Sequence, residues 1–229
     1  MATQTPARPR AALDQKLLTT GFEIPPDGVN PKRIDYIFDT MPGNRPSTYG
    51  NKVFIWETSG HDVPRNQPFK NENSVTSDRP DGDGTFPEDV TNLSYLLGYA
   101  TGPAVENVCA TVFVPAIGQG DPVIYPPSVT LERIGTNVVT FSYSMPGGSQ
   151  PMADNDWAGL WENQTSSALY SVPPKWFVQI PENTAKGAGA LQNVRLLRST
   201  SYILGYFKGG YSTSKPKQST LACSLTFQT

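Results

Sequence analysis

The sequence has 229 residues and a formal net charge of −2, with 17% charged residues, which excludes the strongly basic surface of a nucleic-acid-binding protein. Hydrophobic residues make up 37% and aromatic residues 10%, too many for an intrinsically disordered chain. The 20 glycines and 22 prolines disfavour long helices and favour short strands joined by turns. No apolar run reaches the length of a membrane-spanning helix, so we expect no membrane span.

The beginning of the sequence lacks the pattern of a secretion signal. Its first ten residues include two arginines but no apolar core follows them. We therefore expect a cytoplasmic protein, or one exported by a non-classical route.

Residues 1–31 are expected to form an extended N-terminal arm. Five prolines between positions 6 and 31 interrupt any continuous helix. The helix-permissive piece from Ala11 to Leu18 is too short to be stable alone. The arm is either a disordered tail or a strap that packs on its own body or on a neighbour.

A six-residue stretch occurs twice in the chain. Ser94–Tyr99 and Ser201–Tyr206 differ at one position and lie 107 positions apart (201 − 94). Three further matches follow the same order: Met41-Pro42-Gly43 with Met145-Pro146-Gly147, Trp56-Glu57 with Trp161-Glu162, and Cys109 and Phe113 with Cys223 and Phe227. The chain is therefore expected to contain two versions of one domain.

Each repeat contains a strand in which apolar and polar residues alternate, as in a half-buried strand, and in the second repeat a strand starting at Val129 and Leu131 comes before it. The alternating strands hold Ile34, Tyr36 and Phe38 in the first repeat and Val139, Phe141 and Tyr143 in the second. Relative to Met-Pro-Gly, the two patterns are one residue out of phase. Since a one-residue slip would turn a strand inside out, we expect a β-bulge in one repeat.

These features predict an all-β protein made of two tandem immunoglobulin-like β-sandwich domains, produced by internal duplication and preceded by an extended arm. The expected boundaries are 1–31 for the arm, 32–115 for the first repeat, 116–127 for a linker and 128–229 for the second repeat. The linker assignment rests on its prolines and glycines, which suit a short extended spacer.

The stretch Asp156-Trp157-Ala158-Gly159-Leu160-Trp161 resembles the Asp-Trp-Ile-Gly-Leu-Phe signature of SKICH-type immunoglobulin-like domains. The closing strand Tyr202–Tyr206 and the turn at Lys208–Gly210 follow it, as in those domains. The resemblance covers roughly residues 128–229, and the first repeat has Asn51-Lys52-Val53 instead. It implies a non-catalytic sandwich that serves interactions.

Cys109 and Cys223 are the only cysteines. A disulfide would require their strands to lie against each other across the domain interface, and the alternative is a buried free thiol in each core.

His61 is the only histidine, so a catalytic site of the Ser-His or Cys-His type would have to use it. The alternative for His61 is an exposed loop.

Asp78, Asp81, Asp83, Glu88 and Asp89 form the densest acidic stretch. A glycine-containing loop with several carboxylates suits calcium, although the EF-hand register fails because Arg79 and Val90 occupy the end positions. The alternative is a solvated, turn-rich loop.

Glu57 and Glu162 each follow a tryptophan, which suggests either a glycosidase-like pair or polar strand ends. Trp56, Trp157, Trp161 and Trp176 could form a stacking platform or belong to the cores. The candidate binding residues are Trp176, Tyr211, Lys208 and Lys215, since they lie where the second repeat differs from the first.

No phosphate-binding loop, dinucleotide fingerprint or nucleophile elbow is present, and no cofactor is expected. The sequence thus favours a non-enzymatic binding or assembly protein that binds a protein partner or itself. The alternative is a carbohydrate- or cell-surface-binding lectin or toxin component. Function is expected where the two repeats differ.

Overall fold

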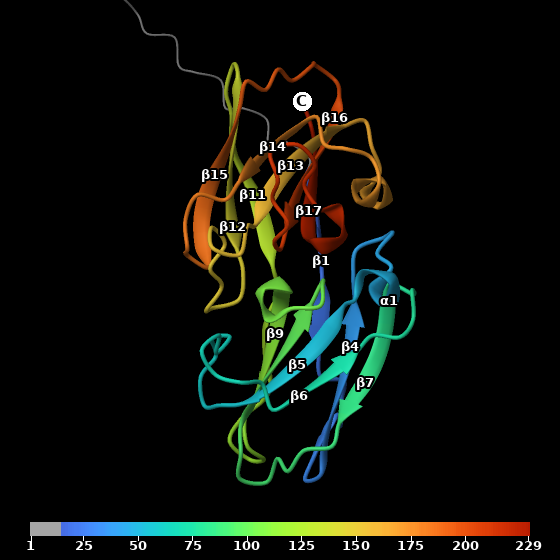
Figure 1. Ribbon diagram of the computed structural model, residues 1–229, viewed down its shortest axis with the longest axis vertical. Coiled ribbons are helices and arrows are strands. Elements are labelled where there is room, and N and C mark those ends of the chain that lie inside the picture. The colour runs from blue at the N-terminus through green and yellow to red at the C-terminus, as the bar shows by residue number, and fades with distance from the viewer. Residues whose placement is uncertain (1–14) are drawn as a thin grey trace, which may run out of the picture.

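The computed structural model describes residues 15–229, and Figure 1 shows two β-sandwiches stacked along its long axis. All long elements are strands, and the helical elements are short: α1 (Pro46–Tyr49), η1 (Val105–Asn107), η2 (Ser166–Tyr170) and η3 (Gln218–Thr220). The expected all-β class with tandem sandwiches is confirmed. Within residues 15–229, no helix is long and apolar enough to cross a membrane.

The first sandwich joins two antiparallel sheets. One contains β2 (Gly21–Glu23), β3 (Val29–Asn30), β4 (Arg33–Asp39) and β7 (Asp81–Phe86), and the other has the order β10 (Val123–Tyr125), β9 (Val108–Val114), β8 (Tyr95–Ala100), β5 (Lys52–Glu57) and β6 (Asn71–Ser74). Ile34, Tyr36 and Phe38 of β4 are buried, while the residues between them are not, because successive side chains of a strand point to opposite faces.

The second sandwich repeats this arrangement. One sheet has the order β11 (Ser128–Ile134), β12 (Val138–Ser144) and β15 (Lys186–Gln192), and the other has the order β1 (Gln15–Thr19), β17 (Leu221–Gln228), β16 (Ser201–Phe207), β13 (Trp157–Glu162) and β14 (Trp176–Gln179). The duplicated stretches become β8 and β16. Both lie inside five-stranded sheets and are almost completely buried, which explains their continuous apolar sequence.

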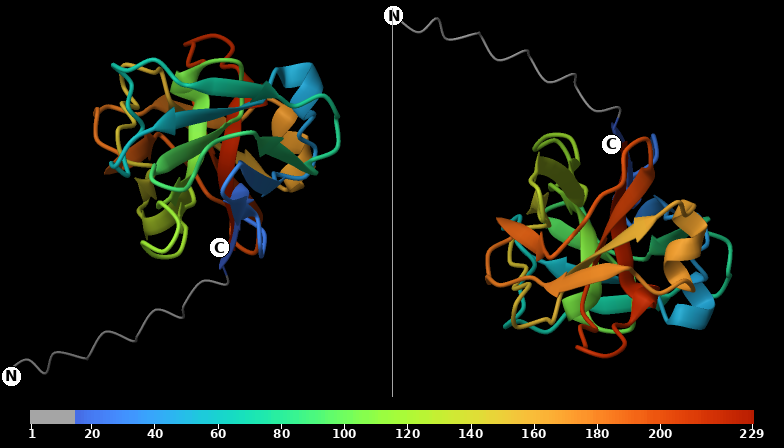
Figure 2. Two further views of the ribbon diagram at one scale, coloured as in Figure 1. Left: turned by 90° about the horizontal axis from the view of Figure 1, so that it is seen from below. Right: turned by 90° about the horizontal axis from the view of Figure 1, so that it is seen from above.

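The two sandwiches exchange a strand with each other. β1 precedes the first sandwich but pairs with β17 of the second, and β10 precedes the second sandwich but pairs with β9 of the first. The two strands occupy equivalent places, since Leu17 lies opposite Leu225 and Ile124 opposite Val112. Figure 2 shows the blue N-terminal strand beside the red C-terminal one.

Because of this exchange, parts of the expected arm and linker are strands of the two sandwiches. Residues 15–23 of the expected arm form β1 and β2, and residues 123–125 of the expected linker form β10. The end of β1 contacts the segment that follows β10, since Thr19 Oγ1 donates a hydrogen bond of 2.5 Å to the carbonyl of Pro127. Of the two alternatives for the arm, the strap that packs on its own body applies to residues 15–31. Residues 1–14 lie outside the described range.

The expected phase conflict between β4 and β12 does not exist. Thr40 N bonds to the carbonyl of Pro80, and Met145 N bonds to that of Ala185, so both partners differ by the same offset (145 − 40 = 105; 185 − 80 = 105). β4 pairs with β7, and β12 with β15, without a register shift, and the shift between Leu131 and Arg133 lies in β11, opposite β12. The bulge prediction was wrong, because the sequence match paired Met41 with Met145, whereas the hydrogen bonds make Thr40 the equivalent of Met145.

Two further bulges lie next to the duplicated strands. Tyr99 pairs with Ala110 and Tyr206 with Cys223, and in each case the register shifts at the next residue. The extra residues are therefore Cys109 in the first repeat and Ala222 in the second. Cys109 and Cys223 are not equivalent positions, contrary to the sequence alignment.

The repeated turns and the long loops hold the two sandwiches together. Val63, from the loop after β5, donates its amide to the carbonyl of Gly147 at 2.9 Å. Reciprocally, the turn at Gly43 packs against Ser167 in the loop after β13. One continuous cluster of buried apolar residues includes Tyr99 and Tyr206 and runs through both repeats. The two sandwiches thus share their main core, and two smaller buried clusters are separate from it.

Candidate functional site

Lys208 lies in the interface between the sandwiches and not on the surface. Its side chain is 1% exposed, and Nζ lies 2.6 Å from Asp156 Oδ2 and 3.7 Å from Asp154 Oδ2. Asp154 also binds both Nη atoms of Arg65 from the first repeat, at 2.5 and 2.6 Å. Lys208 was thus a wrong choice as a binding residue, because these buried carboxylates use its charge.

Asp156 begins the SKICH-like stretch and has a structural role. Its carboxylate accepts hydrogen bonds from Tyr206 Oη at 2.9 Å and from the Gly209 amide at 2.7 Å. Burial raises its pKa, against the opposing effect of Lys208. In the first repeat the equivalent pair is Asn51 and Tyr99, joined at 3.0 Å. The carboxylate at the start of the motif thus anchors β13 to Tyr206, Lys208 and Gly209.

The acidic stretch does not assemble into one site. Asp78 binds Thr48 and Arg45, Asp81 pairs with Arg79, Glu88 pairs with Lys70, Asp89 pairs with Lys32, and Asp83 lies in β7 opposite Ile37. Hydrogen bonds from Thr48 lower the pKa of Asp78. Across residues 15–229, no group of three or more His, Cys, Asp or Glu side chains could hold a metal ion. The geometry of the structure therefore gives no support to the calcium hypothesis.

The other candidate binding residues are separated in the structure. Trp176 is half-buried in the edge strand β14, with Lys175 Nζ 4.8 Å from its ring centre. Tyr211 packs beside Phe177, with ring centres 6.2 Å apart, and Lys215 is exposed in the loop after β16. Because a lysine of the same chain lies over one face of Trp176, that face is not free to stack on a ligand.

His61 lies in an exposed loop, where its ring stacks on Phe113 at 4.0 Å and Nδ1 lies 2.6 Å from Tyr125 Oη.

Glu57 and Glu162 each bind a lysine, Lys70 at 3.1 Å and Lys175 at 2.5 Å. The two ion pairs occupy equivalent places in the two repeats. This arrangement fits the polar strand ends better than a pair of catalytic carboxylates.

The two cysteines are free and fully buried. Burial raises the pKa of Cys109 to about 12, and burial together with the nearby Cys109 raises that of Cys223. The two thiols thus lie near each other in the shared core. A thiol that resists ionisation is a poor nucleophile, so neither is suited to catalysis.

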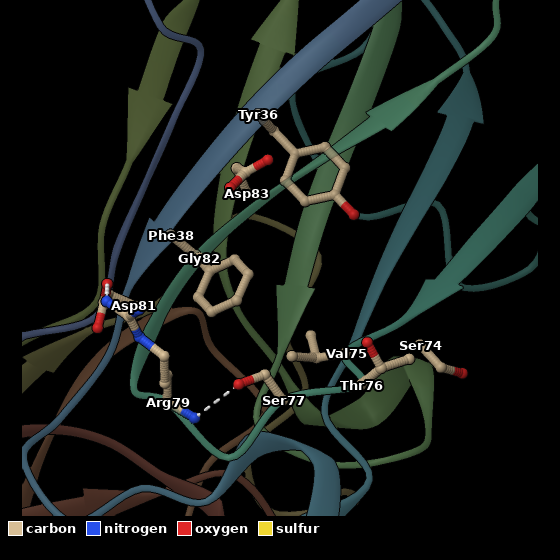
Figure 3. A pocket seen from close by; sticks show the side chains of 10 residues that line it. All are labelled: Tyr36, Phe38, Ser74, Val75, Thr76, Ser77, Arg79, Asp81, Gly82 and Asp83. Atoms are coloured by element: carbon tan, nitrogen blue, oxygen red, sulfur yellow. Dashed lines mark hydrogen bonds and ion pairs between the residues drawn. The ribbon is translucent and has the colours of Figure 1, made fainter.

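A cleft of about 340 Å³ opens at the edge of the first sandwich, between β6 and β7 (Figure 3). Its lining residues are Tyr36, Phe38, Ser74, Val75, Thr76, Ser77, Arg79, Asp81, Gly82 and Asp83. The aromatic rings lie against glycines of β7, since a Cβ at Gly82 would lie 2.6 Å from Phe38 Cζ. The cleft therefore combines aromatic side chains with hydroxyl, guanidinium and carboxylate groups.

The cleft occurs where the two repeats differ. Val75 N bonds to the carbonyl of Asn51, and Ile180 N bonds to that of Asp156, so Val75 and Ile180 are equivalent (180 − 75 = 105; 156 − 51 = 105). Ile180 is fully buried, whereas the smaller Val75 is half-buried and lines the cleft.

Sequence reasoning found only Asp81 and Asp83 of this cleft. It missed the rest because they are ordinary hydroxyl and core residues until the fold brings them together. One signal was available, the glycine alternation at Gly82 and Gly84, which recurs at Gly187 and Gly189. In both repeats it lies opposite the aromatic residues of the neighbouring strand.

No family model matches the sequence, and no curated protein matches it. Among solved structures, the FN1–FN3 domains of chicken CNTN1 match with 12% sequence identity and a TM-score of 0.24. That match covers 76% of this chain and 54% of the other, so this chain spans about half the length of the solved one. A likeness at this level does not bear on function. The description that the geometry supports is an all-β protein of two tandem immunoglobulin-like sandwiches.

Proposed function

We propose that this chain is a non-enzymatic binding protein whose ligand site is the cleft beside β7. The supporting observation is the difference between Val75 and Ile180 at equivalent positions. A duplicated scaffold needs the same core contacts in both repeats. A cavity present because one repeat departs from that shared core is therefore the best candidate for a function of its own.

The chemistry of the cleft favours a small polar ligand or a short peptide. Ser74, Thr76 and Ser77 supply hydroxyls, Arg79 supplies a cation, and Phe38 supplies an apolar surface at the inner end. Binding sites commonly combine an apolar floor with a few polar groups that fix orientation. The volume of about 340 Å³ lies at the small end of the range for such sites.

A carbohydrate is the second candidate ligand, and with it a lectin or toxin component that binds cell surfaces. The observation that favours it is the combination of aromatic rings with the two carboxylates of Asp81 and Asp83. Carboxylates accept hydrogen bonds from sugar hydroxyls, and aromatic rings contact the apolar faces of sugars. The ring of Trp176 is a weaker candidate because Lys175 lies over it.

A role in interactions agrees with the resemblance of residues 156–161 to SKICH-type domains, which implies a non-catalytic sandwich. Binding of a protein partner, or of a second copy of the chain, belongs to the same proposal. The absence of catalysis is also part of it, because the only histidine bonds to Tyr125 and both thiols are buried.

The test is a fragment and glycan screen read by amide chemical shifts, with a variant that rebuilds the cleft. Val75→Ile with Thr76→Pro reproduces the Ile180-Pro181 sequence of the second repeat. We expect ligands to shift amides between residues 74 and 83, and we expect this double variant to lose those shifts. Lys215→Gln, an exposed change in the second repeat, serves as the control and should keep them.

Three results would contradict the proposal. The first is a set of ligands whose shifts map only outside residues 74–83. The second is equal binding by the double variant, provided that its melting temperature equals that of the native chain. The third is turnover of a bound compound that disappears in a His61→Ala variant, since it would indicate an enzyme.

A further inference from the structure

The end of the second sandwich that carries the C-terminus presents an arginine-rich tip. Two segments form it: the end of β11 with the turn that follows it (residues 133–136), and the β15–β16 connection, with the stretch Arg195–Arg198. Figure 1 shows both at the same end of the long axis. All of these residues except Arg195 line one open cleft of about 690 Å³ together with Thr229. We call these residues the basic tip.

The arginines of the basic tip are not used within the chain. Arg133, Arg195 and Arg198 are all exposed, and in residues 15–229 none of them lies within ion-pair distance of a carboxylate. The adjacent acid, Glu132, accepts a hydrogen bond from Ser142 at 2.6 Å. Arg133, Arg195 and Arg198 outnumber the carboxylates of Glu132 and the chain end, so the tip carries an excess of positive charge in a chain whose net charge is −2.

An exposed leucine lies between these arginines. Leu197 is 56% exposed, the highest value among the large apolar side chains of the described residues. Its neighbour Leu196 is half-buried against the shared core. A single exposed apolar side chain is common on a protein surface, so the exposure of Leu197 matters here only together with Arg195 and Arg198, between which it lies in the sequence.

The backbone holds Leu197 in this outward position. On one side Val194 is buried and its amide bonds to the carbonyl of Asn137 at 3.0 Å. The Leu197 amide bonds to Tyr202 Oη at 2.8 Å, and the Ser199 amide bonds to the carbonyl of Thr229 at 2.7 Å. The exposure of Leu197 thus belongs to a loop with a defined conformation.

The corresponding connection at the other end of the molecule has the opposite charge. Before β8, it carries Glu88 and Asp89, and each carboxylate binds a lysine of its own sandwich. The long axis therefore runs from an end with paired charges to one with unpaired arginines. This asymmetry indicates that the basic tip faces an anionic partner.

We propose that the basic tip docks on an anionic phospholipid surface. The guanidinium groups bind lipid phosphates, for which their planar forks are well suited. Leu197 enters the boundary between headgroups and acyl chains. A surface that combines cations with an apolar side chain fits this interface better than a soluble anion, which the cations alone would satisfy. The cleft beside β7 then remains free, since it lies on the other sandwich.

The first test is sedimentation of the full chain with vesicles of phosphatidylcholine, with and without about one third phosphatidylserine. We expect binding to the anionic vesicles only, and a decrease as salt rises. Arg195→Gln with Arg198→Gln should weaken binding roughly 25-fold, and Leu197→Ser should weaken it about fivefold. The matched controls are Lys215→Gln with Lys217→Gln for charge, and Ile117→Ser for exposed apolar surface; both should bind like the native chain.

A second readout does not depend on the stability of these variants. A Leu197→Cys variant carries an environment-sensitive dye, which the two native cysteines do not accept because they are buried. Its fluorescence should shift to the blue with anionic vesicles, while a dye at Ile117→Cys should not respond.

Three outcomes overturn the proposal. One is the absence of binding to anionic vesicles by the native chain. Another is an equal loss of binding in the charge control. The last is displacement by inorganic phosphate with no effect of Leu197→Ser and no dye response, which would make the tip a site for soluble anions.

Discussion

Lys208 Nζ lies 2.6 Å from Asp156 Oδ2, and neither side chain is more than 1% exposed. The equivalent residues of the first repeat are Thr101 and Asn51, because Thr101 N and Lys208 N bond to corresponding carbonyls. Two neutral residues in one sandwich are thus replaced by a charged pair in the other. The charged pair lies where the two repeats meet, and Asp154 connects it to Arg65.

The charged pair can be tested by copying the two neutral residues. Asp156→Asn leaves the buried cation of Lys208 with only the more distant Asp154, so the free energy of unfolding should fall by about 3–5 kcal/mol. Adding Lys208→Thr reproduces the Asn51–Thr101 combination and should restore most of that loss. Denaturant unfolding of both variants measures the effect. A double variant no more stable than Asp156→Asn would contradict this account.

The contact between the turn at Gly148 and the other sandwich predicts a strong effect of a single methyl group. Gly148 has φ of +80°, and a Cβ there would lie 2.5 Å from the carbonyl oxygen of Val63. Gly118 has φ of +81° and nothing near its Cβ position. Gly118→Ala should therefore cost only the backbone strain, about 1 kcal/mol, and Gly148→Ala at least about 2 kcal/mol more.

Thermal unfolding of the two alanine variants separates strain from the contact. Equal melting temperatures would show that the turn does not hold the sandwiches together. The expected result is a lower melting temperature for Gly148→Ala than for Gly118→Ala.

The exchanged strand β1 predicts how the chain behaves without it. Deleting residues 1–19 exposes the unpaired edge of β17, and such an edge favours association between chains. We expect light scattering to show larger species and a lower melting temperature. Deleting residues 1–14 leaves β1 in place and is the matched control. An unchanged size and stability after the longer deletion would mean that β1 contributes nothing to the second sandwich.

The burial of Cys109 predicts a pH dependence in the alkaline range. Its pKa rises from 9.0 to about 12 in the folded chain, so the folded state keeps the thiol protonated after the unfolded state has ionised. The stabilising contribution is therefore complete below 9 and is lost as the pH rises toward 12. A Cys109→Ala variant should lack this part of the slope of unfolding free energy against pH.

The same burial predicts that both thiols are inert at neutral pH. A thiol reagent should react only at the rate of unfolding, and both thiols should react at once in denaturant. Rapid labelling of the native chain would show that the shared core opens locally.

The sequence by itself determined the strands and the duplication. Period-two alternation at Ile34, Tyr36 and Phe38 and the continuous apolar run of Ser94–Tyr99 are local signals, since a strand shows its burial on each face directly in its sequence. The one-residue errors at Met41 and Cys109 arose because turns and bulges change the spacing without changing the kind of residue. Identity alone could not show which residue was the extra one.

Only the tertiary structure decided which sheet receives each first strand, and whether Lys208 is buried. A strand pattern shows that a segment can pair at the edge of a sheet, but it does not show which sheet provides that edge, and β1 and β10 each pair with the sandwich of the other repeat. A lysine in a glycine-rich turn reads as exposed, since the two aspartates that allow its burial lie more than fifty positions away. The local pattern of residues determines the strands, and contacts between distant residues determine which strands pair. The cleft and the basic tip are formed by segments that lie far apart in the sequence, so only the tertiary structure shows them.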